Sequence, residues 1–267
     1  MFKYKLGVIG AGFMATAIIK GAIKSKILNA NEIIVSDVYA KSLEKIATTG
    51  VFTTQNNTEI VNDCEFVLFA IKPQNLNDVL DSIVGGNCKK FISIMAGVKK
   101  AKITSRLPGI KVARCMPNTP CSIGCGAVGV DLSDYDNEND VQFIKNLLSS
   151  FAIVVPVPET KLNAVTGISG SSPAYFYLFL KGLIDSGVRH GLSEEESKIL
   201  AVNTMIGAGK MVLENSEKSL DDLISAVCSK GGTTIEAINV YNNNGLNDIT
   251  NEAVDACINR AFELENL

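Results

Sequence analysis

A short glycine-rich turn lies between an apolar run and a helical pattern near the start of the chain. The apolar run Lys5–Ile9 ends at Gly10, and Gly12 precedes Met14–Ser25, whose apolar spacing is typical of a helix. In a strand–turn–helix of this kind, the first glycine permits the tight turn, the second lets a pyrophosphate approach the backbone, and Ala15 supplies the third small position. Free N–H groups and the dipole of the helix N-terminus favour phosphate. The turn predicts a dinucleotide-binding site.

Short β-rich runs alternate with helical stretches over residues 1–156, a pattern typical of a parallel sheet covered on both faces. We expect strands at Lys5–Ile9, Glu32–Ser36, Glu65–Ala70, Phe91–Ile94, Lys111–Arg114, Gly126–Val130 and Ala152–Val155, and helices at Met14–Ser25, Lys41–Thr48, Asn75–Ile83 and Asn137–Ser149. The glycine motif alone is weak evidence, because many strand-to-helix turns use glycine, but its place at the start of this alternation strengthens it. The sequence predicts an α/β, Rossmann-like domain.

The alternation stops near Val155–Pro158, and residues 157–267 carry helical patterns with hardly a strand candidate. The expected helices are Pro173–Ser186, one that starts at the capping box Ser193–Glu196, Asp221–Val227, Thr233–Asn243 and Thr250–Leu264. This region is short and rich in apolar residues, so we expect it to bury surface against a second subunit. The predicted architecture is a Rossmann-like domain, 1–156, followed by an all-α dimerisation domain, 157–267.

Composition narrows the classes of function. A formal net charge of −3 gives no basic footprint for nucleic acid. The apolar runs are far shorter than the roughly 20 residues of a membrane helix, and a strand begins too early for a secretory signal, so we expect a soluble cytoplasmic protein. With one histidine and seven scattered cysteines that form no CxxC pair, we expect no metal site.

Several residues at expected strand ends are candidates for cofactor contacts. Asp37 closes the second strand, where a carboxylate can accept the ribose hydroxyls of NADH and would repel the 2′-phosphate of NADPH; it could also merely begin a turn. Lys72 follows the third strand, where it could contact the cofactor or could equally be a solvated charge at the strand end. The small Ala96 and Gly97 would let a flat ring come close.

The stretch from Cys228 to Ala237 is the most informative part of the second region. Two glycines and two threonines precede a helix, so backbone N–H groups and hydroxyls could converge on a small carboxylate. The same residues could form only a flexible loop and an N-cap. The residues by themselves leave both interpretations open.

Six motifs together resemble those of a known family. They are GAGFMA at Gly10–Ala15, AIKP at Ala70–Pro73, SIMAGV at Ser93–Val98, RCMPNTP at Arg114–Pro120, VTGISGSSPAY at Val165–Tyr175 and SKGGTTIEA at Ser229–Ala237. Their order and spacing are similar to those of pyrroline-5-carboxylate reductases over essentially the whole chain. Three positions depart from the family pattern: Lys230 replaces a usual proline, Ser172 a frequent glycine, and Asp37 a neutral or basic residue of NADPH-preferring members.

The resemblance implies reduction of 1-pyrroline-5-carboxylate to L-proline by NADPH or NADH, the last step of proline biosynthesis. It implies a homodimer or a higher oligomer built from dimers. The implied cofactor-binding residues are Ile9, Gly10, Ala11, Gly12, Phe13, Met14, Asp37, Asn57, Ala70, Ile71, Lys72, Pro73, Ala96 and Gly97. The implied substrate-binding residues are Ser229, Gly232, Thr233 and Thr234, with Thr234 also catalytic through a hydroxyl directed at the imine nitrogen.

Two alternative functions fit the same architecture. One is a reductase of another cyclic imine or of a hydroxyacid; the helical lysines Lys181 and Lys210 could act as acid–base groups there, but neither lies in a matching motif. The other is a nucleotide-binding protein that has lost catalysis, against which the intact Thr233 and Thr234 count.

Overall fold

A computed structural model of the protein describes residues 2–265. These residues fall into two compact units. One contains the residues up to Pro173 together with those from Cys257 onward, and the other is Ala174–Ala256. Packing therefore divides the chain near residue 173, whereas the sequence pattern changes at residue 156, because the first turns after the sheet and the last turns of the chain pack within the first unit.

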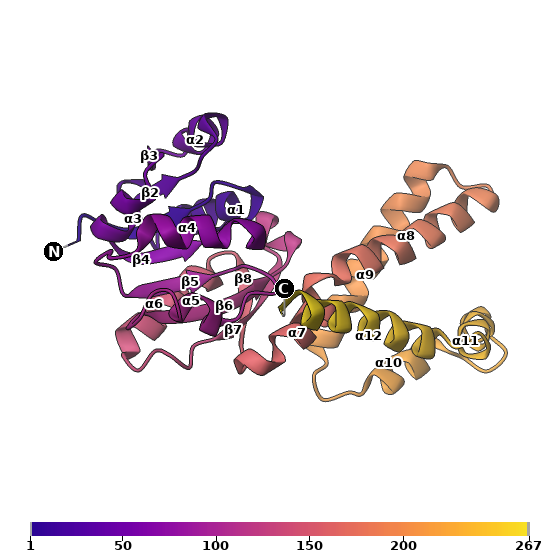
Figure 1. Cartoon of the computed structure of the whole chain (residues 1–267). Coiled ribbons are helices and arrows are strands. Elements are labelled where there is room, and N and C mark those ends of the chain that lie inside the picture. The colour runs from indigo at the N-terminus through magenta and orange to yellow at the C-terminus, as the bar shows by residue number, and fades with distance from the viewer. Residues whose placement is uncertain (1, 266–267) are drawn as a thin grey trace. The chain divides into compact units, whose positions relative to one another are not determined.

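The first unit is built on one eight-stranded sheet in the order β3-β2-β1-β4-β5-β6-β7-β8. Figure 1 shows its strands among the indigo to pink helices of this unit. The strands are β1 (Tyr4–Ile9), β2 (Ile33–Ser36), β3 (Phe52–Thr54), β4 (Cys64–Phe69), β5 (Lys90–Ser93), β6 (Lys111–Pro117), β7 (Gly126–Asp131) and β8 (Ala152–Pro156). The chain moves outward from β1 to β3 and then returns to the other side of β1 with β4. The order therefore reverses beside β1, which is where open α/β sheets bind ligands.

The sheet is parallel except where β7 pairs antiparallel with β6. A parallel sheet was expected, and the antiparallel pairing of β6 with β7 departs from that expectation. The connection between the two strands consists only of residues 118–125, with the 3₁₀ turn η3 (Thr119–Ile123) inside it. A parallel return needs a crossover of roughly a dozen residues or more, so this short turn sends the chain back antiparallel.

Helices cover both faces of the sheet, as expected. Helices α1 (Phe13–Lys24), α2 (Ala40–Ala47) and α6 (Glu138–Ser149) bury their apolar residues on one face. Helices α3 (Asn57–Asp63), α4 (Leu76–Ile83) and α5 (Lys100–Thr104) do so on the other. The two cores use alternate residues of each strand; on β4, Phe66 belongs to the first core and Val67 to the second.

After β8 the described chain is helical. The elements are η4 (Glu159–Lys161), α7 (Leu162–Val165), a π-turn η5 (Thr166–Gly170), α8 (Ser172–Arg189), α9 (Glu194–Glu214), α10 (Leu220–Val227), α11 (Thr233–Asn243) and α12 (Leu246–Glu265). Ser193 caps α9 in the expected capping box with Glu196. Within residues 2–265, none of the helices is long and apolar enough to cross a membrane.

Gly7 in β1 allows close packing of α3 on the sheet. A Cβ atom there would lie 2.5 Å from Cγ2 of Ile60 and 2.6 Å from Sγ of Cys64. We expect Gly7→Ala to lower the free energy of unfolding by about 1–3 kcal/mol, because the core would have to shift. Urea unfolding at matched protein concentration measures this, with Gly12→Ala, whose Cβ would meet no atom within 4 Å, as the matched control. Equal stability of the two variants would contradict this account of the packing.

Candidate active site

The carboxyl ends of the central strands form one aligned edge. Ile9 of β1 lies opposite Ser36 of β2 and Phe69 of β4, and Phe69 lies opposite Ser93 of β5. The residues that follow these strands therefore emerge side by side. Gly10, Asp37 and Ala70 each come directly after one of them, so the structure brings together three of the strand-end segments expected to bind a cofactor.

Gly10 makes the turn after β1 at a position that has no room for a side chain. Its φ is +101°, and a Cβ atom would lie 2.6 Å from the carbonyl oxygen of Ala70. The Gly10 N–H donates to the Ser36 carbonyl at 2.7 Å, and the Ala70 N–H donates to the Ile9 carbonyl at 2.9 Å. Any side chain would thus clash with backbone in a conformation that only glycine adopts readily.

Gly12 ends this turn as the N-cap of α1, and the space beside it is open. No atom lies within 4 Å of the position that a Cβ would occupy. Gly12 has no side chain to cap the helix, and the first turn of α1 contains no acidic residue. The backbone around Phe13 and Met14 is therefore suited to a pyrophosphate, which needs both close approach and helix N–H donors. The donor set fits the expected dinucleotide.

Asp37 links the end of β2 to the glycine-rich turn. Its Oδ2 accepts a hydrogen bond from the Ala11 N–H at 2.7 Å, and its Oδ1 accepts one from the Tyr39 N–H at 2.8 Å. The hydrogen bond from Tyr39 shows that Asp37 does begin a turn, which was the alternative interpretation of this residue. The contact with Ala11 goes further, because it holds a carboxylate directly beside the expected phosphate-binding loop.

Asn57, the first residue of α3, lies beside the end of β2. Its Oδ1 accepts a hydrogen bond from Oγ of Ser36 at 2.7 Å, and its Nδ2 donates to Oγ of Ser82 at 3.1 Å. The neighbouring Gln55 donates to the Val38 carbonyl at 3.4 Å. The side chains that reach this end of the site from the loop after β3 are thus neutral amides.

The remaining expected cofactor residues follow β4 and β5. Ala70 and Ile71 are partly buried, while Lys72 is exposed and precedes the 3₁₀ turn η2 (Pro73–Asn75). Ala96 is exposed, and Gly97 takes the left-handed conformation with φ +69°. These residues lie past the same edge of the sheet as Gly10, since their strands are in register with β1.

The expected substrate residues come together at the start of α11, in the second compact unit. Gly232 is the N-cap, and no side chain caps the helix. The Gly232 N–H donates to the Ser229 carbonyl at 2.9 Å, and a Cβ on Gly232 would lie 2.4 Å from Oγ of Ser229. A hydroxyl, the Thr233 and Thr234 side chains and an uncapped helix N-terminus thus share one short segment, an arrangement that suits a carboxylate.

Two of the residues that depart from the family pattern, Ser172 and Lys230, fit their surroundings without a clash or a buried unpaired polar group. Ser172 is buried, and its Oγ donates to the Ile168 carbonyl at 2.6 Å, with the Gly167 carbonyl at 3.2 Å. The hydroxyl that replaces a glycine is therefore satisfied. Lys230 is exposed in the loop before α11 and disturbs no packing.

A group of buried charges at the same sheet edge was not expected from the sequence. Arg114, at 4 % exposure, pairs with Glu159 and with Glu265, and Lys100 pairs with Asp131 and Asp134. The only signal in the sequence is a charged residue within or at the end of an otherwise apolar run, as Arg114 is in β6 and Asp131 is at the end of β7. Their partners are distant in the chain and could not be identified from it.

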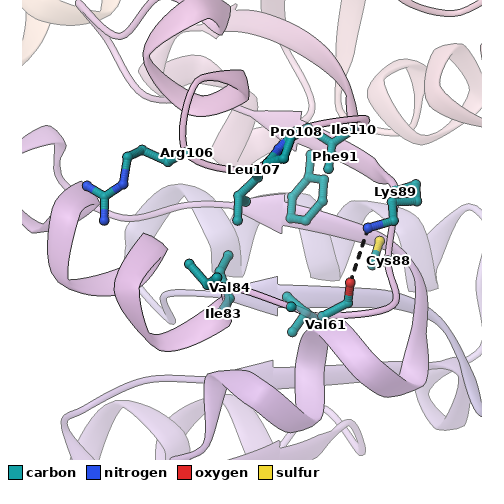
Figure 2. A pocket seen from close by; sticks show the side chains of 12 residues that line it. Val61, Ile83, Val84, Cys88, Lys89, Phe91, Arg106, Leu107, Pro108 and Ile110 are labelled. Atoms are coloured by element: carbon teal, nitrogen blue, oxygen red, sulfur yellow. Dashed lines mark hydrogen bonds between the residues drawn. The ribbon is translucent and has the colours of Figure 1, made fainter.

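A separate apolar cavity of about 200 Å³ lies at the opposite edge of the sheet (Figure 2). It is lined by the end of α4, the residues that lead into β5 and the turn before β6, including Ile83, Phe91 and Leu107. Figure 2 shows the Cys88 N–H donating to the Val61 carbonyl, at 2.8 Å. Burial raises the pKa of the Cys88 thiol to about 11, so this cysteine is unreactive at neutral pH. The cavity adds nothing to the nucleotide site.

Among residues 2–265, no three His, Cys, Asp or Glu side chains are grouped so that they could hold a metal ion. The doubly wound sheet and the glycine-rich turn at its switch point define the class as a dinucleotide-binding protein.

Comparison with known proteins identifies the family. The profile "Pyrroline-5-carboxylate reductase dimerisation" matches residues 159–264, and "NADP oxidoreductase coenzyme F420-dependent" matches residues 5–97. A pyrroline-5-carboxylate reductase of Haemophilus influenzae is 37 % identical over 98 % of both chains. The chain belongs to the pyrroline-5-carboxylate reductase family.

Solved structures agree with this assignment. A pyrroline-5-carboxylate reductase from Coxiella burnetii has a TM-score of 0.89, 30 % identity and coverage of 98 % of both chains. The Plasmodium falciparum pyrroline carboxylate reductase with NADP bound also has a TM-score of 0.89, at 29 % identity over 99 % of both chains. The Rossmann-like fold with a helical dimerisation domain is thereby confirmed.

The open space at Gly12 yields a test of the nucleotide site. We expect Gly12→Ala to fold normally but to bind NADH at least tenfold more weakly, about 1.4 kcal/mol, because a methyl group would occupy the path of the pyrophosphate. Titration of NADH fluorescence measures the affinity. An unchanged affinity would mean that the phosphates do not approach this backbone.

Proposed function

We propose that this protein reduces 1-pyrroline-5-carboxylate to L-proline with a reduced nicotinamide cofactor, as the last step of proline biosynthesis. The observation that carries the proposal is the match over nearly the whole chain to reductases of this substrate. A glycine-rich turn alone would suit many oxidoreductases, but the match also covers the segment Ser229–Ala237. The geometry of both segments supports the same reaction.

On the cofactor side, the backbone from Ile9 to Met14 would hold the pyrophosphate, and Asp37 and Asn57 would lie at the adenosine ribose. Residues Ala70–Pro73 and the pair Ala96 and Gly97 would border the second ribose and the nicotinamide. These roles agree with the aligned strand ends and with the space left at Gly12. A bound NADH or NADPH supplies the hydride.

On the substrate side, Ser229, Gly232 and Thr233 would hold the carboxylate through hydroxyl and N–H donors at the start of α11. Thr234 would direct its hydroxyl at the ring nitrogen. A protonated imine already accepts hydride at its carbon, and the nitrogen then becomes the neutral amine without a further proton. The chain therefore has mainly to align two rings, and a threonine can orient the nitrogen without acting as a strong acid.

The direct test is loss of reduced-nicotinamide absorbance with 1-pyrroline-5-carboxylate, run with NADH and with NADPH. Formation of L-proline supports the proposal. Turnover of hydroxyacids or of another cyclic imine, and not of this one, would point to a different reductase of the same architecture. Cofactor binding without any turnover would point to a non-catalytic nucleotide-binding protein.

Replacing Thr234 tests its proposed role. We expect Thr234→Ala to keep the fold and the NADH affinity but to lower kcat/KM for the imine about tenfold or more, as loss of one transition-state contact does. Thr250→Ala, which removes a threonine hydroxyl from the exposed surface of α12, is the matched control. An unchanged kcat/KM would remove Thr234 from the mechanism.

Asp37 supports a preference for NADH. Its carboxylate is fixed beside the Ala11 N–H, and its neighbours Asn57 and Gln55 are uncharged. The 2′-phosphate of NADPH would bring two negative charges close to this carboxylate, whereas the 2′-hydroxyl of NADH could donate to it. The nearest cation along the chain, Lys41, is exposed in the first turn of α2.

We expect wild type to favour NADH over NADPH by at least tenfold in affinity, and Asp37→Asn to reduce this ratio to about threefold or less. Asparagine can still accept from the Ala11 N–H, while the N–H of the exposed Tyr39 can turn to water. Fluorescence titration with both cofactors measures the ratio, and Lys41→Ala tests whether Lys41 contributes. Preference for NADPH in wild type would contradict the role given to Asp37.

Assembly into homo-oligomers accords with the dimerisation domain of the family. The second unit carries many large apolar side chains that are exposed in the single chain, among them Phe176, Leu178, Leu200 and Leu213. A second copy would cover such a surface. We propose a dimer, with larger oligomers built from dimers, acting in the cytoplasm without nucleic-acid or membrane partners.

A further inference from the structure

The last turn of α12 ends in a buried ion pair with the sheet. Nη2 of Arg114 donates to Oε1 of Glu265 at 2.7 Å, and both side chains are only 4 % exposed. The other arm of the guanidinium, Nη1, donates to Oε1 of Glu159 at 3.2 Å. One arginine on β6 thus holds the last turn of α12 and the 3₁₀ turn that follows β8.

Glu265 is ionised at neutral pH. Burial acts to raise the pKa of its carboxyl group, but the hydrogen bonds from Arg114 and Asn163 and the charges of Arg114 and Lys99 outweigh burial, so the pKa is lowered. Nζ of Lys99 lies 3.4 Å from Oε2 of Glu265. The carboxylate therefore joins β6, α7 and the loop between β5 and α5.

The β5–α5 loop is the segment expected to border the nicotinamide, and it is fixed from two sides. Leu264 lies against Gly97, where a Cβ atom would be 3.1 Å from Cβ of Leu264. At the other end of the loop, the Lys100 N–H donates to Oε1 of Glu159 at 2.7 Å. Both supports depend on Arg114, because it pairs with Glu159 and with the residue after Leu264.

We propose that Glu265 is a positioning residue for hydride transfer. It contacts the loop and Arg114, and through them it sets the position of Ala96 and Gly97 beneath the nicotinamide. This inference rests on the proposed reductase function. Buried ion pairs are often no more stabilising than apolar residues of similar size, so the position of this pair at the loop matters more than its contribution to stability. Small displacements of reacting groups lower the rates of such reactions steeply.

The chain offers a matched pair of variants, Glu265→Gln and Glu263→Gln. Glu263 lies two residues away, is 62 % exposed and pairs with the exposed Arg260, at 2.5 Å. At a temperature where thermal unfolding shows every variant folded, we expect Glu265→Gln to lower kcat at least tenfold while the NADH dissociation constant changes less than twofold. Glu263→Gln should match wild type, and Glu265→Asp should recover part of the rate.

A second readout does not depend on catalysis. Hydrogen exchange followed by mass spectrometry on the cofactor-free protein should show at least tenfold faster exchange over residues 94–100 in Glu265→Gln, and no change there in Glu263→Gln. Should Glu265→Gln fail to fold, Arg114→Lys, which keeps the charge but cannot bridge both carboxylates, is tested by the same criteria.

The outcomes separate this inference from the proposed function. A wild-type protein that does not reduce the imine contradicts the function, and the exchange experiment then still decides whether Glu265 fixes the loop. With an active wild type, a Glu265→Gln variant that keeps wild-type kcat and loop exchange, even with a lower Tm, overturns the inference. A variant that loses NADH affinity but keeps kcat overturns it as well.

Discussion

The close approach of two backbones at Gly10 is the constraint on which the site depends. The carbonyl of Ala70 occupies the space where any other residue would carry a Cβ, and the left-handed φ of Gly10 turns the chain directly from β1 into α1. Because β1 and β4 meet there, the switch point of the sheet, the N-terminus of α1 and the end of β2 lie at one place. The Ala11 N–H donates a hydrogen bond to Asp37, which links the end of β2 to this turn and places a negative charge beside it.

A second constraint comes from charge at the same edge of the sheet. The buried Arg114 holds two carboxylates with its guanidinium, that of the buried Glu265 and that of the partly buried Glu159. The lowered pKa of Glu265 means that its contribution to stability is present above the ordinary pKa of a glutamic acid and is lost as pH falls through the lowered value. The β5–α5 loop is thus supported by a carboxylate, Glu265, that stays ionised at neutral pH.

Local patterns predicted much of the fold and the glycine-rich turn after β1. Apolar runs such as Glu65–Ala70 located their strands, and the GAGFMA motif located the turn, because both depend on neighbouring residues. The strand β3 (Phe52–Thr54) and helix α3 (Asn57–Asp63) were not predicted, since the first has three residues and the second has little apolar periodicity. The direction of β7 was not predicted, because β6 continues to Pro117, beyond the expected strand end at Arg114, and leaves only residues 118–125 to connect it to β7.

Interactions between distant residues were beyond prediction from one sequence. The partners Arg114 and Glu265 are 151 positions apart, and no motif in the sequence indicates that they pair. The substrate segment Ser229–Ala237 was identified through family resemblance, because its glycines and threonines also suit an ordinary helix cap. The roles of the individual site residues remain proposals for the experiments above.

The most direct test of the proposed reduction follows the hydride from the nicotinamide to the imine carbon. NADH that carries deuterium at both C4 positions is incubated with the protein and 1-pyrroline-5-carboxylate, and the product is examined by mass spectrometry and NMR. The account predicts L-proline with one deuterium, located at C5. Failure to form proline, or proline without the label, would contradict it.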